Sequence, residues 1–166
     1  ATIFDSCYLE GDGNPPLADR LGAMAREAGM PICGGNCMGY NILDSKCFVT
    51  GYPTPYKTAH GGIAFITHSG TAYGSIPQAD PRLGFNMVIS SGREMATTMA
   101  DYMHYALAQD TTRVIALFLE TGRDPEGFVA ALERARERSV PVVVLKVGRT
   151  EVSARMAATH SGAIAG

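Results

Sequence analysis

The sequence contains no tryptophan, and charged residues make up only 18% of its 166 positions. Its 14 lysines and arginines stand against 16 aspartates and glutamates, a formal net charge of −2. No surplus of positive charge is therefore present to bind a nucleic acid backbone. The longest uninterrupted apolar run covers residues 114–119, well short of the roughly 20 residues that cross a bilayer. We expect neither a nucleic acid nor a membrane as a partner.

Cysteine is scarce and lacks a metal-binding pattern. All four cysteines lie in the first third of the chain: Cys7, Cys33, Cys37 and Cys47. None of them has the C-x2-C spacing of a structural zinc site, so we expect reduced thiols and no metal site. Asp5 and Glu10 interrupt the first apolar segments, and no basic region precedes them, which is unlike a signal peptide. These features predict a cytoplasmic protein.

A regular alternation of elements begins near residue 60. Short apolar runs predict strands at 63–67, 87–90, 114–120 and 142–147, and the amphipathic stretches between them predict helices at 71–79, 94–108 and 125–138. Two of the strands, 114–119 and 142–145, are almost entirely apolar, which is typical of strands covered by helices on both faces. The pattern predicts an open, doubly wound parallel sheet.

Residues 1–55 have a different pattern. A helix is expected over 17–28, and residues 30–33 predict a short strand that enters a glycine-rich turn. Residues 46–60 contain two prolines and predict an extended connector. Because this part is too short for a core of its own, we interpret residues 1–55 as the tail of a preceding domain plus a connector. The domain with the doubly wound sheet then covers residues 56–166.

Polar, glycine-containing turns follow the predicted strands, and ligands of doubly wound sheets bind at that edge. Ser69, Gly70 and Thr71 open a helix whose free N–H groups favour an anion, although such residues also simply cap helices. Ser91, Gly92 and Arg93 follow the next strand.

Two ionisable residues are further candidates. Glu120 ends an apolar strand, where its carboxylate needs a partner, and a helix cap or a salt bridge would also satisfy it. His160 lies in a loop of small residues and could be a base, a metal ligand, a nucleophile or a surface group. We expect the other three histidines, His60, His68 and His104, to be structural or surface groups; of these, His68 adjoins the proposed anion site at Ser69.

Several short motifs occur in a fixed order between residues 30 and 166. They are residues 67–71 (THSGT), 89–92 (ISSG), 110–116 (DTTRVIA), 119–120 (LE), 141–149 (PVVVLKVGR) and 159–166 (THSGAIAG), with Asp101 between the second and third. This ordered set resembles the nucleoside-diphosphate-forming acyl-CoA synthetases, the relatives of succinyl-CoA synthetase. In that family a CoA-binding Rossmann domain precedes a flavodoxin-like domain that carries a transiently phosphorylated histidine. The resemblance thus implies that residues 1–55 are the tail of a CoA-binding Rossmann-like domain plus a connector, and that residues 56–166 are a flavodoxin-like CoA-ligase domain.

The resemblance implies a role for each candidate residue. His160 corresponds to the phosphohistidine, Glu120 to the carboxylate that orients it, and Ser69-Gly70-Thr71 to the phosphate-binding helix start. Ser91, Gly92 and Arg93 are candidates for contacting the substrate. Arg93 stands where related synthetases often have asparagine, and it could pair with an anionic substrate or be a surface arginine. The implied substrates are ATP with Mg, CoA and a small carboxylic acid, and the implied partner is an ATP-grasp domain or subunit.

The family's other parts are not found in these residues. The glycine-rich CoA loop and the ATP-grasp segment are missing, and the sequence ends six residues after His160. We therefore expect a fragment of a larger, oligomeric enzyme that is inactive alone. An alternative is a non-catalytic module that senses acyl-CoA or nucleotide, but a sensor needs neither Glu120 nor His160. A flavin-binding flavodoxin is disfavoured because the expected loop and any tryptophan are missing.

Overall fold

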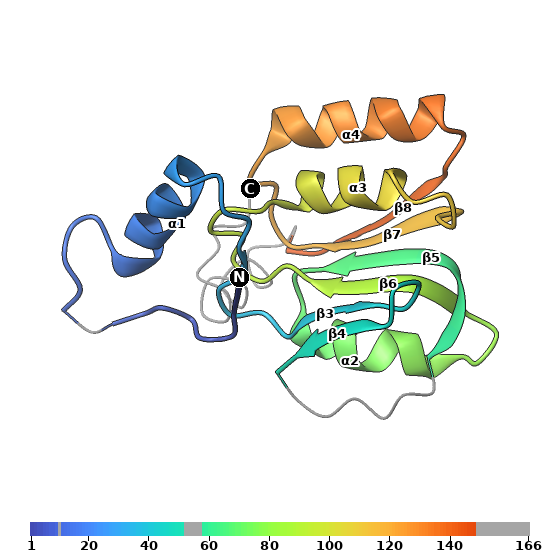
Figure 1. Ribbon diagram of the computed structural model, residues 1–166, viewed down its shortest axis with the longest axis horizontal. Coiled ribbons are helices and arrows are strands. Elements are labelled where there is room, and N and C mark those ends of the chain that lie inside the picture. Colours follow the sequence, from blue (N-terminus) through green and yellow to red (C-terminus); the bar gives the residue numbers. More distant parts are fainter. Residues whose placement is uncertain (10, 52–57, 149–166) are drawn as a thin grey trace.

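The computed structural model describes residues 1–9, 11–51 and 58–148 (Figure 1). Its strands are β1 (Thr2–Ile3), β2 (Cys33–Gly34), β3 (Gly39–Ile42), β4 (Cys47–Thr50), β5 (Ala59–Thr67), β6 (Gly84–Ser90), β7 (Val114–Leu119) and β8 (Val142–Lys146). Its helices are α1 (Leu17–Glu27), α2 (Gly70–Ala79), α3 (Met99–Leu107) and α4 (Pro125–Glu137). Among these residues, no helix combines the length and the apolar character that crossing a bilayer requires.

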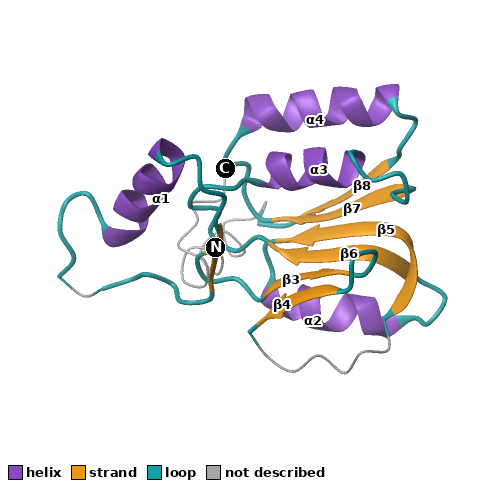
Figure 2. Ribbon diagram, viewed as in Figure 1, coloured by secondary structure: helices purple, strands orange, loops and turns teal. Residues whose placement is uncertain are grey.

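A six-stranded sheet in the order β4-β3-β6-β5-β7-β8 forms the centre of the molecule. Strands β6, β5, β7 and β8 are parallel, and α2 covers one face while α3 and α4 cover the other (Figure 2). Taken in chain order, the parallel strands have the arrangement 2-1-3-4 that is typical of flavodoxin-like sheets. The predicted fold class is therefore confirmed. The order of the strands reverses between β5 and β7, where such sheets bind their ligands.

The core consists of one apolar layer on each face of this sheet. Beneath α3 and α4, the fully buried side chains include those of Ile66, Met87 and Met103. Beneath α2, Phe65, Tyr73 and Phe85 form the second layer. In β5, Phe65 and Ile66 belong to opposite layers, because successive side chains of a strand point to opposite faces. Helix α2 contributes Tyr73 to one layer, and helix α3 contributes Met103 to the other. The two layers hold the carboxyl ends of β5, β6 and β7 at one edge.

Local sequence explains where two of the helices start. Helix α4 begins as predicted, with the Asp124 carboxylate accepting a hydrogen bond of 2.9 Å from the Gly127 N–H. Helix α3 was expected from residue 94 but begins at Met99, so this prediction is wrong by five residues. Thr98 and Asp101 form a capping box there, in which each side chain bonds the other residue's backbone N–H. Residues 94–98 therefore lie outside the helix, in the loop at the carboxyl ends of the parallel strands.

Strand β8 differs from the expectation. Its apolar residues predicted cover on both faces, yet Val143 is 61% exposed and Leu145 is 55% exposed. Within the described ranges, β8 is one of the two edge strands of the sheet and is paired only with β7. An apolar run shows that a strand needs cover, but it does not show which residues provide it.

Part of residues 1–55 belongs to the same sheet. Strands β3 and β4 form an antiparallel hairpin, and β3 pairs antiparallel with β6. The expected connector at 46–60 is thus a strand at both ends, since β4 begins at Cys47 and β5 at Ala59. The predicted helix near the N-terminus is confirmed as α1, which contributes Ala25 to a small cluster with Ile32 and Met95. The domain division at residue 55 stays a prediction, but it separates two strands from the sheet they complete.

Candidate active site

The loops that follow β5, β6 and β7 meet at the carboxyl edge of the sheet. The Ser91 N–H donates to the Thr67 carbonyl over 2.9 Å, and the His68 N–H donates to the Phe118 carbonyl over 3.1 Å. These bonds extend the parallel pairing one residue beyond the strands. The predicted site residues after the three strands are therefore brought to one place, next to the reversal in strand order. His160 lies outside the described residues.

Ser69 caps helix α2. Its hydroxyl accepts a hydrogen bond of 3.2 Å from the Ala72 N–H, and its own N–H donates to the Thr67 hydroxyl oxygen over 2.9 Å. The capping alternative is thus confirmed for Ser69. A side chain on Gly70 would approach Met38 to 3.0 Å, so glycine allows this turn to pack closely. Binding of a phosphate by Ser69, Gly70 and Thr71 stays a prediction.

The loop after β6 is bonded to the turn that follows β2. The Arg93 N–H donates to the Gly35 carbonyl over 2.7 Å, and one guanidinium nitrogen donates to the Ser6 carbonyl over 3.1 Å. Gly92 has a φ of +62°, and an added Cβ would lie 2.3 Å from the Gly35 oxygen. The guanidinium of Arg93 therefore makes a structural hydrogen bond within the protein. Contacts of Ser91, Gly92 and Arg93 with a substrate stay a prediction.

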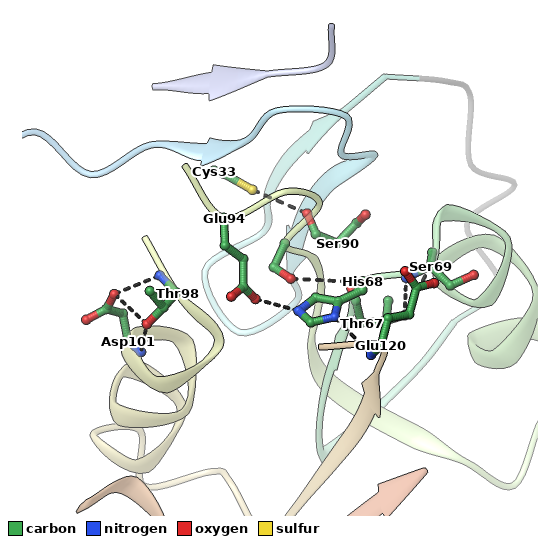
Figure 3. A network of polar contacts seen from close by, with 10 residues as sticks. Cys33, Thr67, His68, Ser69, Ser90, Glu94, Thr98, Asp101 and Glu120 are labelled. Carbon is green, nitrogen blue, oxygen red and sulfur yellow. Dashed lines mark hydrogen bonds and ion pairs between the residues drawn. The ribbon is translucent and has the colours of Figure 1, made fainter. Parts of the chain in front are cut away.

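A buried histidine–carboxylate pair lies between these loops and was not predicted from the sequence. The His68 Nε2 atom lies 2.7 Å from Glu94 Oε1, and the two side chains are only 3% and 1% exposed. The second ring nitrogen, Nδ1, accepts a hydrogen bond of 3.0 Å from the Glu120 N–H. Figure 3 shows the ring between the Glu94 carboxylate and the Glu120 backbone. The only signal in the sequence was the position of His68 beside the Ser69 turn.

Glu120 begins the loop after β7 and is half-buried. The Lys146 ammonium, at the end of β8, donates to the Glu120 carbonyl over 2.8 Å and to the Val147 carbonyl over 2.7 Å. The backbone of Glu120 is therefore held from both neighbouring strands. The predicted contact between its carboxylate and His160 involves a residue outside the described ranges and stays a prediction.

A cavity of about 230 Å³ opens between the first turns of α3 and α4. It is lined by Glu94, Thr98, Met99, Ala100, Leu119, Thr121, Gly122, Arg123, Asp124, Pro125, Phe128 and Val129. Its wall is largely apolar, and the charged residues among those that line it are Glu94, Arg123 and Asp124. Glu94 of the buried pair therefore borders a space large enough for a small ligand. Among the described residues, no three histidine, cysteine or acidic side chains are grouped as metal ligands would be.

Comparison with known proteins identifies the family. Residues 60–166 match the profile of the succinyl-CoA ligase like flavodoxin domain. A trans-feruloyl-CoA synthase from an unknown prokaryotic organism is 34% identical to the chain, over 100% of the chain and 24% of that protein. An ADP-forming acetate–CoA ligase from Methanocaldococcus jannaschii is 28% identical, over 93% of the chain and 22% of that protein.

A solved structure agrees with these matches. The dinucleotide-forming acetyl-coenzyme A synthetase 1 of Ca. Korarchaeum cryptofilum, in complex with phosphate and ADP, superimposes with a TM-score of 0.81 at 30% identity. The match covers 100% of this chain and 36% of that one. The chain thus spans between a fifth and two fifths of the length of these relatives. Because the family profile covers well over half of its residues, the chain belongs to the family of the succinyl-CoA ligase like flavodoxin domain.

Proposed function

We propose that the chain is the phosphohistidine-bearing part of an ADP-forming acyl-CoA synthetase that acts in the cytoplasm. The observation that carries this proposal is the meeting of the Ser69 and Glu120 turns at the strand reversal, in a chain of this family. Relatives that match almost the whole chain are named as CoA ligases and synthases with different acids. The family's reaction class, the joining of an acid to a thiol, is thus better supported than any one substrate.

The proposed reaction has three steps. His160, as a neutral imidazole, attacks the γ-phosphorus of ATP, which forms a P–N bond and releases ADP. The phosphoryl group then passes to a carboxylate oxygen of the acid, which frees the histidine and yields an acyl phosphate. The CoA thiolate finally attacks the acyl carbon and expels inorganic phosphate. Histidine suits this relay because its phosphoramidate readily gives up the phosphoryl group, whereas a serine phosphate would not.

The described residues would support this relay in distinct ways. The Glu120 carboxylate would bond one ring nitrogen of His160 and leave the other free to attack phosphorus. The first turn of α2, with Ser69, Gly70 and Thr71, would hold the phosphoryl oxygens with its N–H groups and its positive dipole end. The loop with Ser91, Gly92 and Arg93, next to the cavity, would contact the acid substrate.

The proposal also includes a second protein part. Two relatives from Pyrococcus furiosus are named as alpha subunits of ADP-forming acetate–CoA ligases, at 31% and 28% identity. A subunit name implies a complementary chain in those enzymes. We propose that an ATP-grasp domain or subunit supplies ATP with Mg to His160 in the oligomeric enzyme.

Labelling with γ-labelled ATP tests the function. The complete protein, with its ATP-grasp part, should acquire an acid-labile and base-stable label that an acid substrate plus CoA discharges. Acetate, 4-hydroxybutyrate and ferulate form the first panel of acids, because relatives are named for them. His160→Ala should abolish the label, while the matched variant His60→Ala, which changes an exposed histidine at the opposite edge of the sheet, should retain it.

The sensing alternative predicts a different result. A non-catalytic module would bind acyl-CoA or nucleotide without acquiring a label and without forming acyl-CoA. A label that persists in His160→Ala would disprove the assignment of the nucleophile. Binding of acyl-CoA with no label in the wild-type protein would favour the sensor.

A further inference from the structure

We propose that His68 is a positioning residue that fixes the backbone of Glu120, and that Glu94 in turn fixes the tautomer of His68. This inference rests on the proposed role of the Glu120 carboxylate. It assigns a task to the buried histidine–carboxylate pair, for which the proposed relay has no other use.

The hydrogen bonds define the protonation of the ring. A backbone N–H can only donate, so Nδ1 of His68 must accept from Glu120 and carries no proton in this arrangement. The proton of the neutral ring is then on Nε2, which donates to Glu94 Oε1 over 2.7 Å. A neutral histidine that donates to an acceptor from one ring nitrogen has its other nitrogen fixed as an acceptor. Glu94 thus keeps the Nδ1 atom of His68 unprotonated, so that it can accept the hydrogen bond from the Glu120 N–H.

The burial and backbone of Glu94 indicate that this pair is specifically maintained. Its side chain is 1% exposed, and a buried carboxylate without a partner is strongly unfavourable. Glu94 also has a φ of +53°, a conformation that residues other than glycine rarely adopt. The neighbouring Arg93 and Met95 N–H groups hold it there through bonds of 2.7 and 2.9 Å to Gly35 and Gly34. Such strain is concentrated at functional sites, where the surrounding structure imposes a required geometry.

The contacts of Glu120 show how its side chain is directed. The peptide group before its Cα is held by His68, which follows β5, through the 3.0 Å bond to the N–H. The peptide group after its Cα is held by Lys146, at the end of β8, through the 2.8 Å bond to the carbonyl. Since β5 and β8 flank β7, both peptide groups of Glu120 are fixed from outside its own strand. The direction of its Cα–Cβ bond is thereby set, and His68 provides one of the two bonds.

Two substitutions of His68 separate positioning from simple packing. In His68→Gln, the amide can donate its N–H to Glu94 and accept the Glu120 N–H with its oxygen, because these atoms are spaced much like the ring nitrogens. In His68→Met, both bonds are lost while an apolar side chain still fills the space. We expect kcat of acyl-CoA formation to fall about 10- to 100-fold in His68→Met, since a small misplacement of a catalytic group has effects of this size. His68→Gln should restore kcat to within about threefold of wild type, on the same reasoning.

The split between kcat and KM is the readout that a purely structural role would not produce. KM for the acid and for CoA should stay nearly constant in His68→Met, because Glu120 acts on the phosphoryl relay and not on these substrates. His60→Met is the matched control, since it removes an exposed histidine from its 2.6 Å contact with Asp44 at the amino edge of the sheet. It should leave both kinetic constants unchanged. If His68→Met fails to fold because Glu94 is left unpaired, the double variant with Glu94→Met takes its place.

A double-mutant cycle tests whether His68 acts through Glu120. In the Glu120→Gln background, adding His68→Met should lower kcat by no more than about twofold, because the two residues form one unit. A full multiplicative loss in that background, or an unchanged kcat in His68→Met, would overturn the proposal. Both results presuppose an active wild-type enzyme, so a wild type that is inactive with every acid would instead count against the proposed function.

A measurement without turnover addresses the same pair. Nitrogen-15 NMR of labelled histidine in the complete protein should show His68 with its proton on Nε2 and with Nδ1 unprotonated. A proton on Nδ1 would be incompatible with the Glu120 bond and would overturn the inference, whatever the enzyme's activity.

Discussion

Gly92→Ala is expected to separate the loop after β6 from the turn after β2. The residue has a φ of +62°, and an added Cβ would lie 2.3 Å from the Gly35 oxygen and 2.9 Å from both the Asn36 oxygen and the Cys37 Cβ. The left-handed backbone costs a residue with a side chain about 1–2 kcal/mol. Overpacking adds about 1–3 kcal/mol, and since two of these neighbours are backbone atoms, they cannot move aside independently. We therefore expect a local destabilisation of about 2–5 kcal/mol.

Hydrogen exchange measured by mass spectrometry on the complete protein tests this value. The Arg93 and Met95 amides bond the turn at 2.7 and 2.9 Å, so they report on its opening. A loss of about 2 kcal/mol should speed their exchange roughly 30-fold. Gly122→Ala is the matched control, because an added Cβ meets no atom within 4 Å there. Unchanged exchange of both amides in Gly92→Ala would refute the view that this contact holds the loop.

Three other measurements follow from the structure. Ser69→Ala removes the cap of α2 and should lower the free energy of unfolding by about 1 kcal/mol, seen as a lower melting temperature, and we also expect slower phosphorylation of the protein. Met103→Ala removes a side chain that is 0% exposed and should cost about 2–5 kcal/mol, so a calorimetric scan in which the midpoint stays constant would contradict its place in the core. Iodoacetamide at pH 8 should modify the exposed Cys47 well before Cys33. A hydrogen bond to Cys37, together with burial, raises the pKa of the Cys33 thiol, and the thiolate is the form that reacts. Equal modification rates of the two cysteines in peptide mass spectrometry would disprove this order.

The parallel strands and their helices were predictable because their signals are local. Strand β7 is a continuous apolar run, and α4 begins with Asp124 and Pro125, which mark a helix start by their own chemistry. Helix α3 was placed too early because residues 94–98 contain nothing that forbids a helix. The bonds that keep Arg93 and Met95 in a loop come from residues 34–35, far away in the sequence.

The candidate site was predictable only in part, for the same reason. Ser69 follows one predicted strand and Glu120 ends another, so the predicted fold alone placed them at one edge of the sheet. The pairing of His68 with Glu94 joins residues 26 positions apart, and neither residue has a neighbour in sequence that indicates the other. Burial of both side chains turns an ordinary histidine and glutamate into an obligatory pair, and burial of that kind depends on the assembled loops.

The hairpin of β3 and β4 has a practical consequence for how this protein is divided. Strand β6 bonds β5 on one side and β3 on the other. A recombinant piece that began at residue 56 would leave the β3 side of β6 without a partner, exposing its N–H and C=O groups beside the buried Val88 and Ile89. An unpaired apolar edge of this kind is a template for association between copies. A piece that retains residues 39–50 keeps that edge covered and should stay monodisperse where the shorter piece aggregates.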